Sequence, residues 1–153
     1  MELTKGGPKT PVKRPYEVVI IMHPDATLEE QKDLFKKNKN TITTYKGTIN
    51  SVESWGKRNL ATPIGRLRKA LFFHSTFEAD PQVVIELERT MRINDKVIRF
   101  MHTKLDERTN IVKHLEAFKK GLTETAQREK EREAKAQLRR QAAMQARQDR
   151  DDE

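Results

Sequence analysis

The spacing of apolar residues predicts alternating strands and helices along the first two thirds of the chain. Residues 15–22 are mostly apolar, rich in β-branched side chains and followed by a His-Pro-Asp turn, so they are predicted to form a buried strand. A helix is predicted to begin at Thr27, because Thr27 and Glu30 fit a capping box in which each side chain bonds the other residue's backbone N–H. Gly47 is expected to end this helix. Its expected apolar face consists of Leu28, Leu34, Phe35, Ile42 and Tyr45.

Two strands are predicted next, separated by a loop. Residues 48–55 alternate in polarity, and residues 69–79 place Leu71, Phe73 and Phe77 on one face of a strand. Residues 56–68 between them are rich in basic residues and glycine, which is typical of a loop. The first of these strands is expected to present on one face Ile49, Ser51, Glu53 and Trp55.

A second helix and a last strand complete the pattern. Asp80 supplies a capping acceptor and Pro81 suits the first helical position, so a helix is predicted to start there. Asn94 and Asp95 are expected to form the turn that leads into a strand over residues 97–105. The expected buried face of the helix consists of Val84, Leu87 and Met91.

The order β-α-β-β-α-β predicts an α+β fold of the ferredoxin-like type, a four-stranded antiparallel sheet with two helices on one face. This domain is expected to span residues 15–105. Residues 1–14 contain a Gly-Gly-Pro run without any apolar period and are predicted to be a flexible basic arm.

Residues 106–153 are predicted to be a charged, mostly helical C-terminal extension. A short amphipathic helix is expected first, and residues 124–150 then combine high helix propensity with few large apolar side chains. Glu124 with Arg128 and Glu131 with Lys135 have the spacing of stabilising ion pairs. Two interpretations stay open: a solvated tail, or an Arg-rich face that docks along RNA or a neighbouring protein. The apolar stripe of the short helix consists of Ile111, Leu115, Phe118 and Leu122.

The charge of the chain suggests a polyanionic partner. The formal net charge is +8, of which residues 1–14 carry +3, residues 15–105 carry +4 and residues 106–153 only +1. There is no cysteine, so a disulfide scaffold and a thiolate metal site are excluded and a reducing, cytoplasmic compartment is expected. The longest apolar run, residues 18–22, is far shorter than the roughly 20 residues that span a bilayer. Nucleic acid, an acidic membrane surface and acidic proteins all remain possible partners at this point.

The sequence gives little support to an enzyme. The four histidines have no metal-binding spacing, and none of the six glycines belongs to a phosphate-binding motif, so we expect no catalytic residue, no metal and no cofactor. A stand-alone RNA-binding module of the same fold is the alternative. Such modules stack bases on aromatic residues of the third strand, and residues 69–74 lack the glycine and the aromatic alternation of that motif.

A basic cluster lies between the two central strands. Its side chains can bind phosphate groups, with arginine doing so through two parallel hydrogen bonds, although an ordinary solvated loop would carry the same composition. The cluster has almost no acidic residue to balance it and begins beside Trp55, which favours a binding surface. It consists of Lys57, Arg58, Arg66, Arg68 and Lys69.

At this cluster the sequence resembles a known family. Residues 53–64, Glu-Ser-Trp-Gly-Lys-Arg-Asn-Leu-Ala-Thr-Pro-Ile, resemble the hallmark segment of the bacterial small-subunit ribosomal protein S-six (S6) family. Residues 15–25, 79–88 and 92–99 resemble its first strand and turn, its second helix and its last helix-to-strand junction, in the same order. The resemblance covers about residues 14–104. Thr62 departs from the tyrosine common at its position.

The resemblance implies a structural constituent of the small ribosomal subunit with no catalysis and no cofactor. It implies binding to 16S ribosomal RNA in the platform, together with ribosomal protein S-eighteen (S18) as a heterodimer. Asn94 has a structural alternative as a turn residue, and Tyr16 has one as a core residue. The RNA or partner contacts carried over by the resemblance, or predicted from the basic cluster, are Arg14, Tyr16, Trp55, Lys57, Arg58, Arg66, Arg68, Arg92, Asn94 and Lys96.

Overall fold

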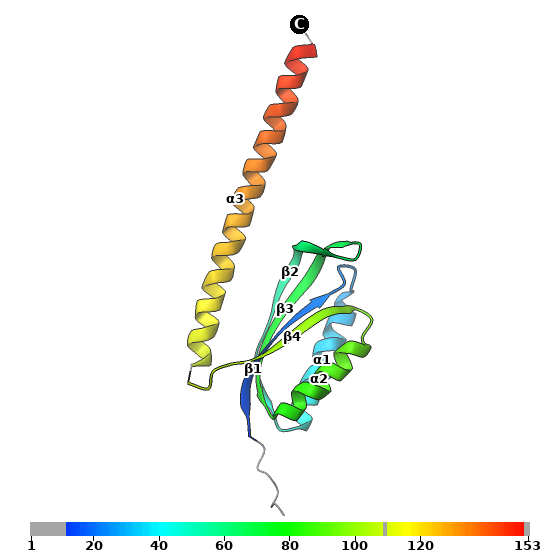
Figure 1. The fold of residues 1–153 in the computed structure, drawn as a ribbon, viewed down its shortest axis with the longest axis vertical. Helices are drawn as coiled ribbons and strands as arrows, with labels where there is room; N and C mark the ends of the chain where they lie inside the picture. The colour runs from blue at the N-terminus through cyan, green and yellow to red at the C-terminus, as the bar shows by residue number, and fades with distance from the viewer. Residues whose placement is uncertain (1–11, 109, 152–153) are drawn as a thin grey trace, which may run out of the picture. The chain divides into compact units, whose positions relative to one another are not determined.

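Four strands and two helices alternate between residues 14 and 104 in the computed structural model, which describes residues 12–108 and 110–151 (Figure 1). This order confirms the predicted ferredoxin-like fold. The described residues form two units, which divide between Arg108 and Thr109, and the second unit is the helix α3, Ile111–Asp151. Of the predicted N-terminal arm, only residues 12–14 lie within the described part of the chain. The elements of the first unit are β1 Arg14–Met22, α1 Leu28–Thr44, β2 Thr48–Ile64, β3 Leu67–Ala79, α2 Pro81–Ile93 and β4 Val97–Lys104.

The strands form one antiparallel sheet in the order β2-β3-β1-β4, with α1 and α2 on the same face (Figure 1). β1 therefore lies inside the sheet, and β2 and β4 are its edges. Tyr16 of β1 lies opposite Phe77 of β3, and Ile20 lies opposite Phe73. Because successive side chains of a strand point to opposite faces, this register places the four residues together on the helix side.

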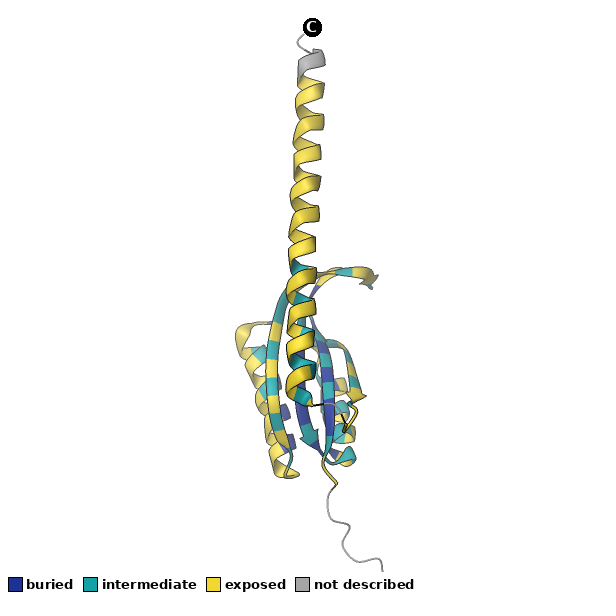
Figure 2. Ribbon diagram, turned by 90° about the vertical axis from the view of Figure 1, so that its left-hand side faces the viewer, coloured by how far each residue is buried: buried dark blue, intermediate teal, exposed yellow. Residues whose placement is uncertain are grey.

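The core lies between this face of the sheet and the two helices, where the buried residues concentrate (Figure 2). Fully burying each large aliphatic or aromatic side chain contributes roughly 1.5–3 kcal/mol. β1 supplies every second residue, from Tyr16 to Met22, and α2 supplies Leu87 and Met91 as predicted. The third buried residue of α2 is Val83, whereas Val84, which was predicted to be buried, is only partly buried.

The buried face of α1 differs from the prediction. Leu28 is 72% exposed and Tyr45 is 47% exposed, while Asn38 is buried between Leu34 and Ile42. Residues at a spacing of four lie on one side of a helix, so positions 34, 38 and 42 form the stripe that faces the sheet. The seven-residue spacing pointed to Leu28, which lies in the first helical turn and remains in solvent.

The loop predicted over residues 56–68 is wrong, because β2 continues to Ile64 and β3 begins at Leu67. The strands are joined by Gly65 and Arg66, and Gly65 has a φ of +59°, a conformation that glycine adopts without strain. Irregularities interrupt the pairing of β2 with β3 at three places, after Ile49, after Ser54 and after Asn59. The first two are bulges of one extra residue in β2, whereas the third places residues 60–63 against the single residue 68 of β3.

The first bulge also corrects the predicted faces of β2. Ile49 was expected on the same face as Ser51 and Trp55. It lies instead opposite Phe77 and packs against the core, whereas Ser51 lies opposite Thr76 on the other face. One extra residue in the strand reverses the direction of the side chains that follow it, as far as the next bulge.

The helix termini follow local chemistry. The predicted capping box is confirmed, with Thr27 Oγ1 accepting from Glu30 N and Glu30 Oε2 accepting from Thr27 N at 2.9 Å. Asp80 likewise caps α2 by accepting from Gln82 N at 2.9 Å. α1 ends at Thr44, three residues before the predicted stop at Gly47, and Lys46 rather than Gly47 has the positive φ, +59°. The Gly47 N–H donates to Ile42 O at 2.8 Å, which closes the last turn.

Gly47 is required by close packing. A Cβ at this position would lie 2.7 Å from Ile42 Cγ2 and 2.9 Å from the Glu78 backbone oxygen. We therefore expect Gly47→Ala to lower the free energy of unfolding by about 1–3 kcal/mol, measured by urea denaturation, because the backbone of β3 cannot move away without loss of packing. Gly121→Ala on α3 is the matched control, since its Cβ would have no neighbour within 4 Å. An unfolding midpoint for Gly47→Ala equal to that of the parent would contradict this account.

Candidate nucleic-acid interface

The hairpin of β2 and β3 projects beyond the rest of the sheet. The last residue of β1, Met22, lies opposite Leu71, so residues 67–70 of β3 extend past it. At about 3.3 Å per residue these four positions carry the hairpin roughly 13 Å beyond β1. Four of the five predicted basic residues lie on this projection: Arg58 on β2, Arg66 in the turn, and Arg68 and Lys69 on β3. Lys57 lies at its base, opposite Leu71 and level with the end of β1.

Acidic residues are absent from the sequence around these cations. Residues 54–77 contain five Lys and Arg residues and no Asp or Glu. Within the part of the chain that the structure describes, Lys57, Arg66, Arg68 and Lys69 are exposed, and none has a carboxylate oxygen within 4.0 Å. Arg58 is half-buried, and its Nε donates to the backbone oxygen of Trp55 at 3.2 Å. The hairpin tip is therefore a concentrated positive charge that is open to an anionic partner.

Trp55 lies at the base of this projection. Its indole ring stacks on His74, with centroids 5.5 Å apart, and on Phe72, at 6.4 Å. His74 is buried, and its Nε2 lies 3.2 Å from Glu17 Oε2 on β1. The sequence suggested a Trp that needs a partner, and the structure gives it aromatic partners on the sheet face opposite the helices. Its ring connects the projecting hairpin to the central strands.

A second group of predicted residues lies at the same end of the sheet. Val97, the first residue of β4, pairs with Met22, so the α2–β4 junction and the hairpin share this end. Arg92 lies 3.4 Å from Glu88 Oε2 and has its guanidinium 5.9 Å from the centre of the Phe100 ring. Lys96 Nζ lies 3.8 Å from Glu30 Oε1. Unlike the hairpin tip, this group is partly balanced by neighbouring carboxylates.

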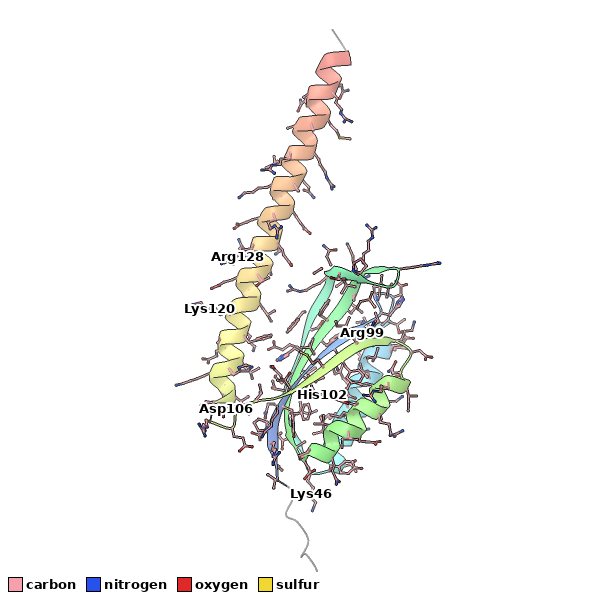
Figure 3. All side chains as sticks on the ribbon, in the orientation of Figure 1. Lys46, Arg99, His102, Asp106, Lys120 and Arg128 are labelled. Atoms are coloured by element: carbon pink, nitrogen blue, oxygen red, sulfur yellow. The ribbon has the colours of Figure 1, made fainter. Side chains whose placement is uncertain are left out.

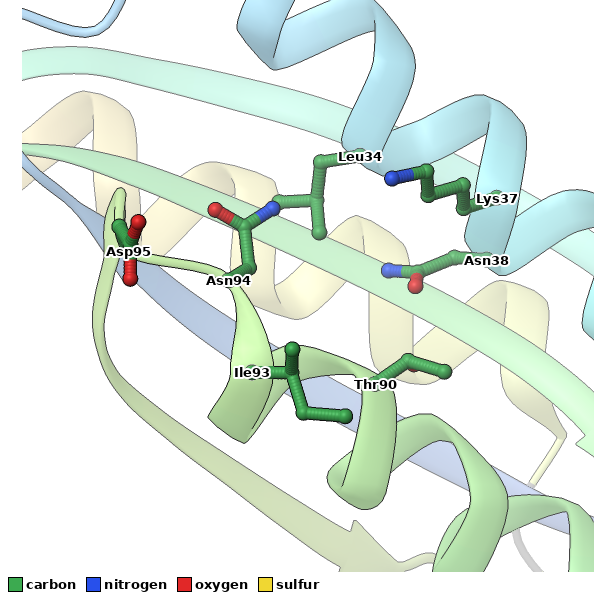
Figure 4. A pocket seen from close by; sticks show the side chains of 7 residues that line it. All are labelled: Leu34, Lys37, Asn38, Thr90, Ile93, Asn94 and Asp95. Atoms are coloured by element: carbon green, nitrogen blue, oxygen red, sulfur yellow. The ribbon is translucent and has the colours of Figure 1, made fainter.

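Asn94 has a structural role at this junction. It is the C-terminal cap of α2, and its Oδ1 accepts from Lys96 N at 3.0 Å, as expected for a turn residue. It also borders a groove of about 500 Å³ between α1 and α2 (Figure 4). The groove is lined by Leu34, Lys37, Asn38, Thr90, Ile93, Asn94 and Asp95.

Sequence reasoning missed this groove. The only signal was Asn38, a polar residue at a helical spacing of four from the apolar Leu34 and Ile42. Asn38 is 9% exposed, and within the described residues its Oδ1 has no hydrogen-bond partner. Ile93 on the facing helix is 67% exposed.

Arg14 and Tyr16 lie away from both groups. Arg14 is the first residue of β1 and lies opposite Ala79, at the far end of the sheet from the hairpin. Tyr16 is 7% exposed and stacks on Phe77 with centroids 5.7 Å apart. Burial raises the pKa of the Tyr16 hydroxyl, with a smaller opposing effect from Arg14. The structure thus places Tyr16 in the core, the alternative that its amphipathic side chain left open.

An apolar groove runs beside the edge strand β2. It has a volume of about 360 Å³ and lies between α1 and β2. Leu28 and Val52, which both line it, are 72% and 48% exposed. Exposed apolar side chains beside an unpaired strand edge are typical of a surface that a protein partner covers. The remaining lining residues are Gln31, Lys32, Phe35, Ser54 and Phe73.

Residues 12–108 and 110–151 contain no group of three or more His, Asp or Glu side chains placed to hold a metal ion. In the same residues, no helix combines the length and the apolar character needed to cross a bilayer.

Known proteins of one family match this chain in both sequence and fold. The family described as Ribosomal protein S6 matches residues 15–104. A small ribosomal subunit protein bS6 from Bdellovibrio bacteriovorus is 74% identical over 121 residues, which cover 79% of this chain and 80% of that protein. A bS6 protein from Geobacter metallireducens is 38% identical over 96 residues, covering 63% and 81%. The crystal structure of 30S ribosomal protein S6 from Thermotoga maritima matches with a TM-score of 0.56 and 29% identity, covering 61% of this chain and 89% of that one.

Proposed function

The chain belongs to the ribosomal protein S6 family, and we propose that it binds the phosphate backbone of 16S ribosomal RNA through the cations at the tip of its β2–β3 hairpin. Membership of this family makes it a structural protein of the small ribosomal subunit, at work on the cytoplasmic ribosome, and not an enzyme. The observation that carries the proposal is the group of five Lys and Arg residues on the hairpin, four of them beyond the end of β1, in a segment without Asp or Glu.

The geometry of the hairpin suits a folded RNA. A narrow two-stranded ribbon can approach a groove or a junction that the body of the domain is too wide to enter. Arg66 and Arg68 can each bind a phosphate group with two parallel hydrogen bonds, and Lys57 acts as a point charge. Contacts of this kind position a protein on RNA by shape and charge without reading bases.

Arg92 and Lys96 form a secondary contact in this proposal. Both are already close to carboxylates, at 3.4 Å and 3.8 Å, and they must exchange these partners for phosphate. Exposed ion pairs of this kind contribute only about 0–1 kcal/mol, so the exchange is feasible but yields less than the unbalanced hairpin tip.

The alternative, a stand-alone module that stacks bases on its sheet, has less support. Stacking needs aromatic rings of β3 that are open on the sheet face. Phe72 and His74 are the aromatic residues of β3 on that face, and the Trp55 ring stacks on both. Trp55 thus occupies the position that a base would take.

The RNA proposal predicts a strong effect of the hairpin charges. Lys57→Gln/Arg66→Gln/Arg68→Gln should weaken binding to 16S ribosomal RNA at least tenfold in filter binding, in the presence of S18 and at fixed salt. The slope of log K against log salt should also fall by roughly two, since each phosphate contact contributes about 0.7–0.9. Lys36→Gln/Lys37→Gln/Lys39→Gln on α1 removes the same charge from another exposed surface and should change affinity less than threefold. Equal losses in the two variants would show that net charge alone, and not the hairpin, drives binding.

S18 is the protein partner that we propose, and the groove between α1 and β2 is where we place it. The proposal is supported by the exposed Leu28 and Val52, which a free protein would otherwise keep in water, and by the adjoining unpaired edge of β2. A partner strand or helix laid on this groove would cover both side chains. The groove adjoins the hairpin strands, so one bound partner and the RNA can be neighbours.

The S18 proposal is tested by polar substitutions in the groove. Leu28→Gln/Val52→Gln should lower the affinity for S18 at least tenfold in isothermal titration calorimetry, because the apolar area that the partner covers is lost. Ile85→Gln on α2 provides the control, since Ile85 is 70% exposed and lies outside the groove. Unchanged S18 affinity in the double variant would place the partner elsewhere.

A further inference from the structure

A row of cations lies on one face of α3. Arg128, Arg132, Lys135 and Arg139 follow one another at intervals of four, three and four residues. With 3.6 residues per turn, these intervals keep the four side chains within a sector of about 60° and spread them over roughly 16 Å of helix. The four residues are called the α3 stripe below. Three of them, Arg132, Lys135 and Arg139, border one surface groove together with Ala136.

The α3 stripe is not neutralised within the helix. The sequence predicted ion pairs of Arg128 with Glu124 and of Lys135 with Glu131. In the described part of α3, neither pair forms, and no carboxylate oxygen lies within 4.0 Å of any of the four cations. All four residues are exposed, and Figure 3 shows the Arg128 side chain standing out from the helix. The predicted ion pairs are therefore wrong for this structure, and four positive charges face solvent together.

The other faces of this part of α3 offer little to a partner. Between residues 124 and 150 the only large apolar side chains are those of Leu138 and Met144. They are 65% and 72% exposed and lie six residues apart. Acidic and basic residues alternate on the remaining surface, so residues 106–153 carry only +1 in total. A helix without an apolar face is recognised mainly through charge, and its strongest charge feature is the α3 stripe.

We infer that the α3 stripe binds phosphate groups of duplex ribosomal RNA. Three of its four members are arginines, and each guanidinium group can donate two parallel hydrogen bonds to the oxygens of one phosphate. The grooves of an A-form duplex are recognised through shape and phosphate contacts, and a charged helix face needs no base contact there. This inference rests on the proposed RNA-binding function and adds a second, independent RNA contact outside the ferredoxin-like domain.

The test compares two triple variants of the full chain. Arg128→Gln/Arg132→Gln/Arg139→Gln removes three charges from the α3 stripe. Lys130→Gln/Arg140→Gln/Arg147→Gln removes three from other faces of the same helix, and glutamine keeps a similar helix propensity in both. Each variant is titrated with 16S ribosomal RNA in the presence of S18, and circular dichroism checks that helicity is equal.

We expect the α3 stripe variant to lose at least tenfold in affinity and the control variant less than threefold. The slope of log K against log salt should fall by about two only in the α3 stripe variant. Equal losses would overturn the inference in favour of non-specific charge, and no loss in either variant would overturn it outright. Normal binding to free RNA combined with release from complete subunits would also overturn it, and would indicate a neighbouring acidic protein as the partner.

The hairpin variant keeps this test separate from the proposed function. In the Lys57→Gln/Arg66→Gln/Arg68→Gln background, a plain 20-base-pair RNA duplex without S18 serves as the probe. We expect the α3 stripe variant to weaken this remaining binding at least fivefold. If the hairpin variant alone weakens 16S binding and the α3 stripe variant has no effect on either probe, the proposed function stands and only the present inference fails.

Discussion

The position of β1 between β3 and β4 is the constraint on which the rest of the structure depends. Both pairings of β1 reach Met22, so the hairpin tip and the α2–β4 junction meet at the same end of the sheet. The pairings are held in register by burial, because Tyr16, Val18, Ile20 and Met22 all face the helices. A slip of one residue would turn all four into solvent. The burial of every second residue of one strand thus determines where the cations of three other elements lie.

In the hairpin, the residues that stabilise the fold lie at the base, and the residues proposed to bind RNA lie mainly at the tip. Its tip lies beyond β1, and there each strand has only the other to pair with. The basic residues of the tip therefore contribute little to the stability of the core, and core packing does not restrict which residues occur there. The base of the hairpin is different, because Trp55 stacks on His74 and Phe72 and ties the ribbon to the centre of the sheet. The charged, solvated tip is therefore attached rigidly to the sheet.

Much of the fold could be predicted from the sequence, because its signals are local. The capping box at Thr27 and the Asp80-Pro81 start each depend on a few neighbouring residues. The extension of β2 to Ile64 could not be predicted, since no alternation of polar and apolar residues marks it. The bulge after Ile49 could not be predicted either, because an extra residue becomes visible only when β2 is paired with β3.

The candidate site was predictable in part. The cations of the hairpin were recognised by their number and by the absence of acids, which are properties of composition. Their separation from Arg14 could not be foreseen, because it depends on the register of β1 against β3. Asn38 shows another limit: the predicted apolar face of the helix left out this polar residue, although it is buried, and the groove beside it was not predicted.

The central place of β1 has a consequence for the synthesis of the chain. β1 is made first, yet its edge partner β4 begins at Val97, about 75 residues after Met22. At about 5–20 residues per second, the ribosome needs roughly 4–15 s to produce β4 after β1 is complete. During that interval one edge of an apolar strand lacks its partner, and contacts between such distant segments form slowly. The nascent protein is therefore most vulnerable to aggregation just before its last strand emerges.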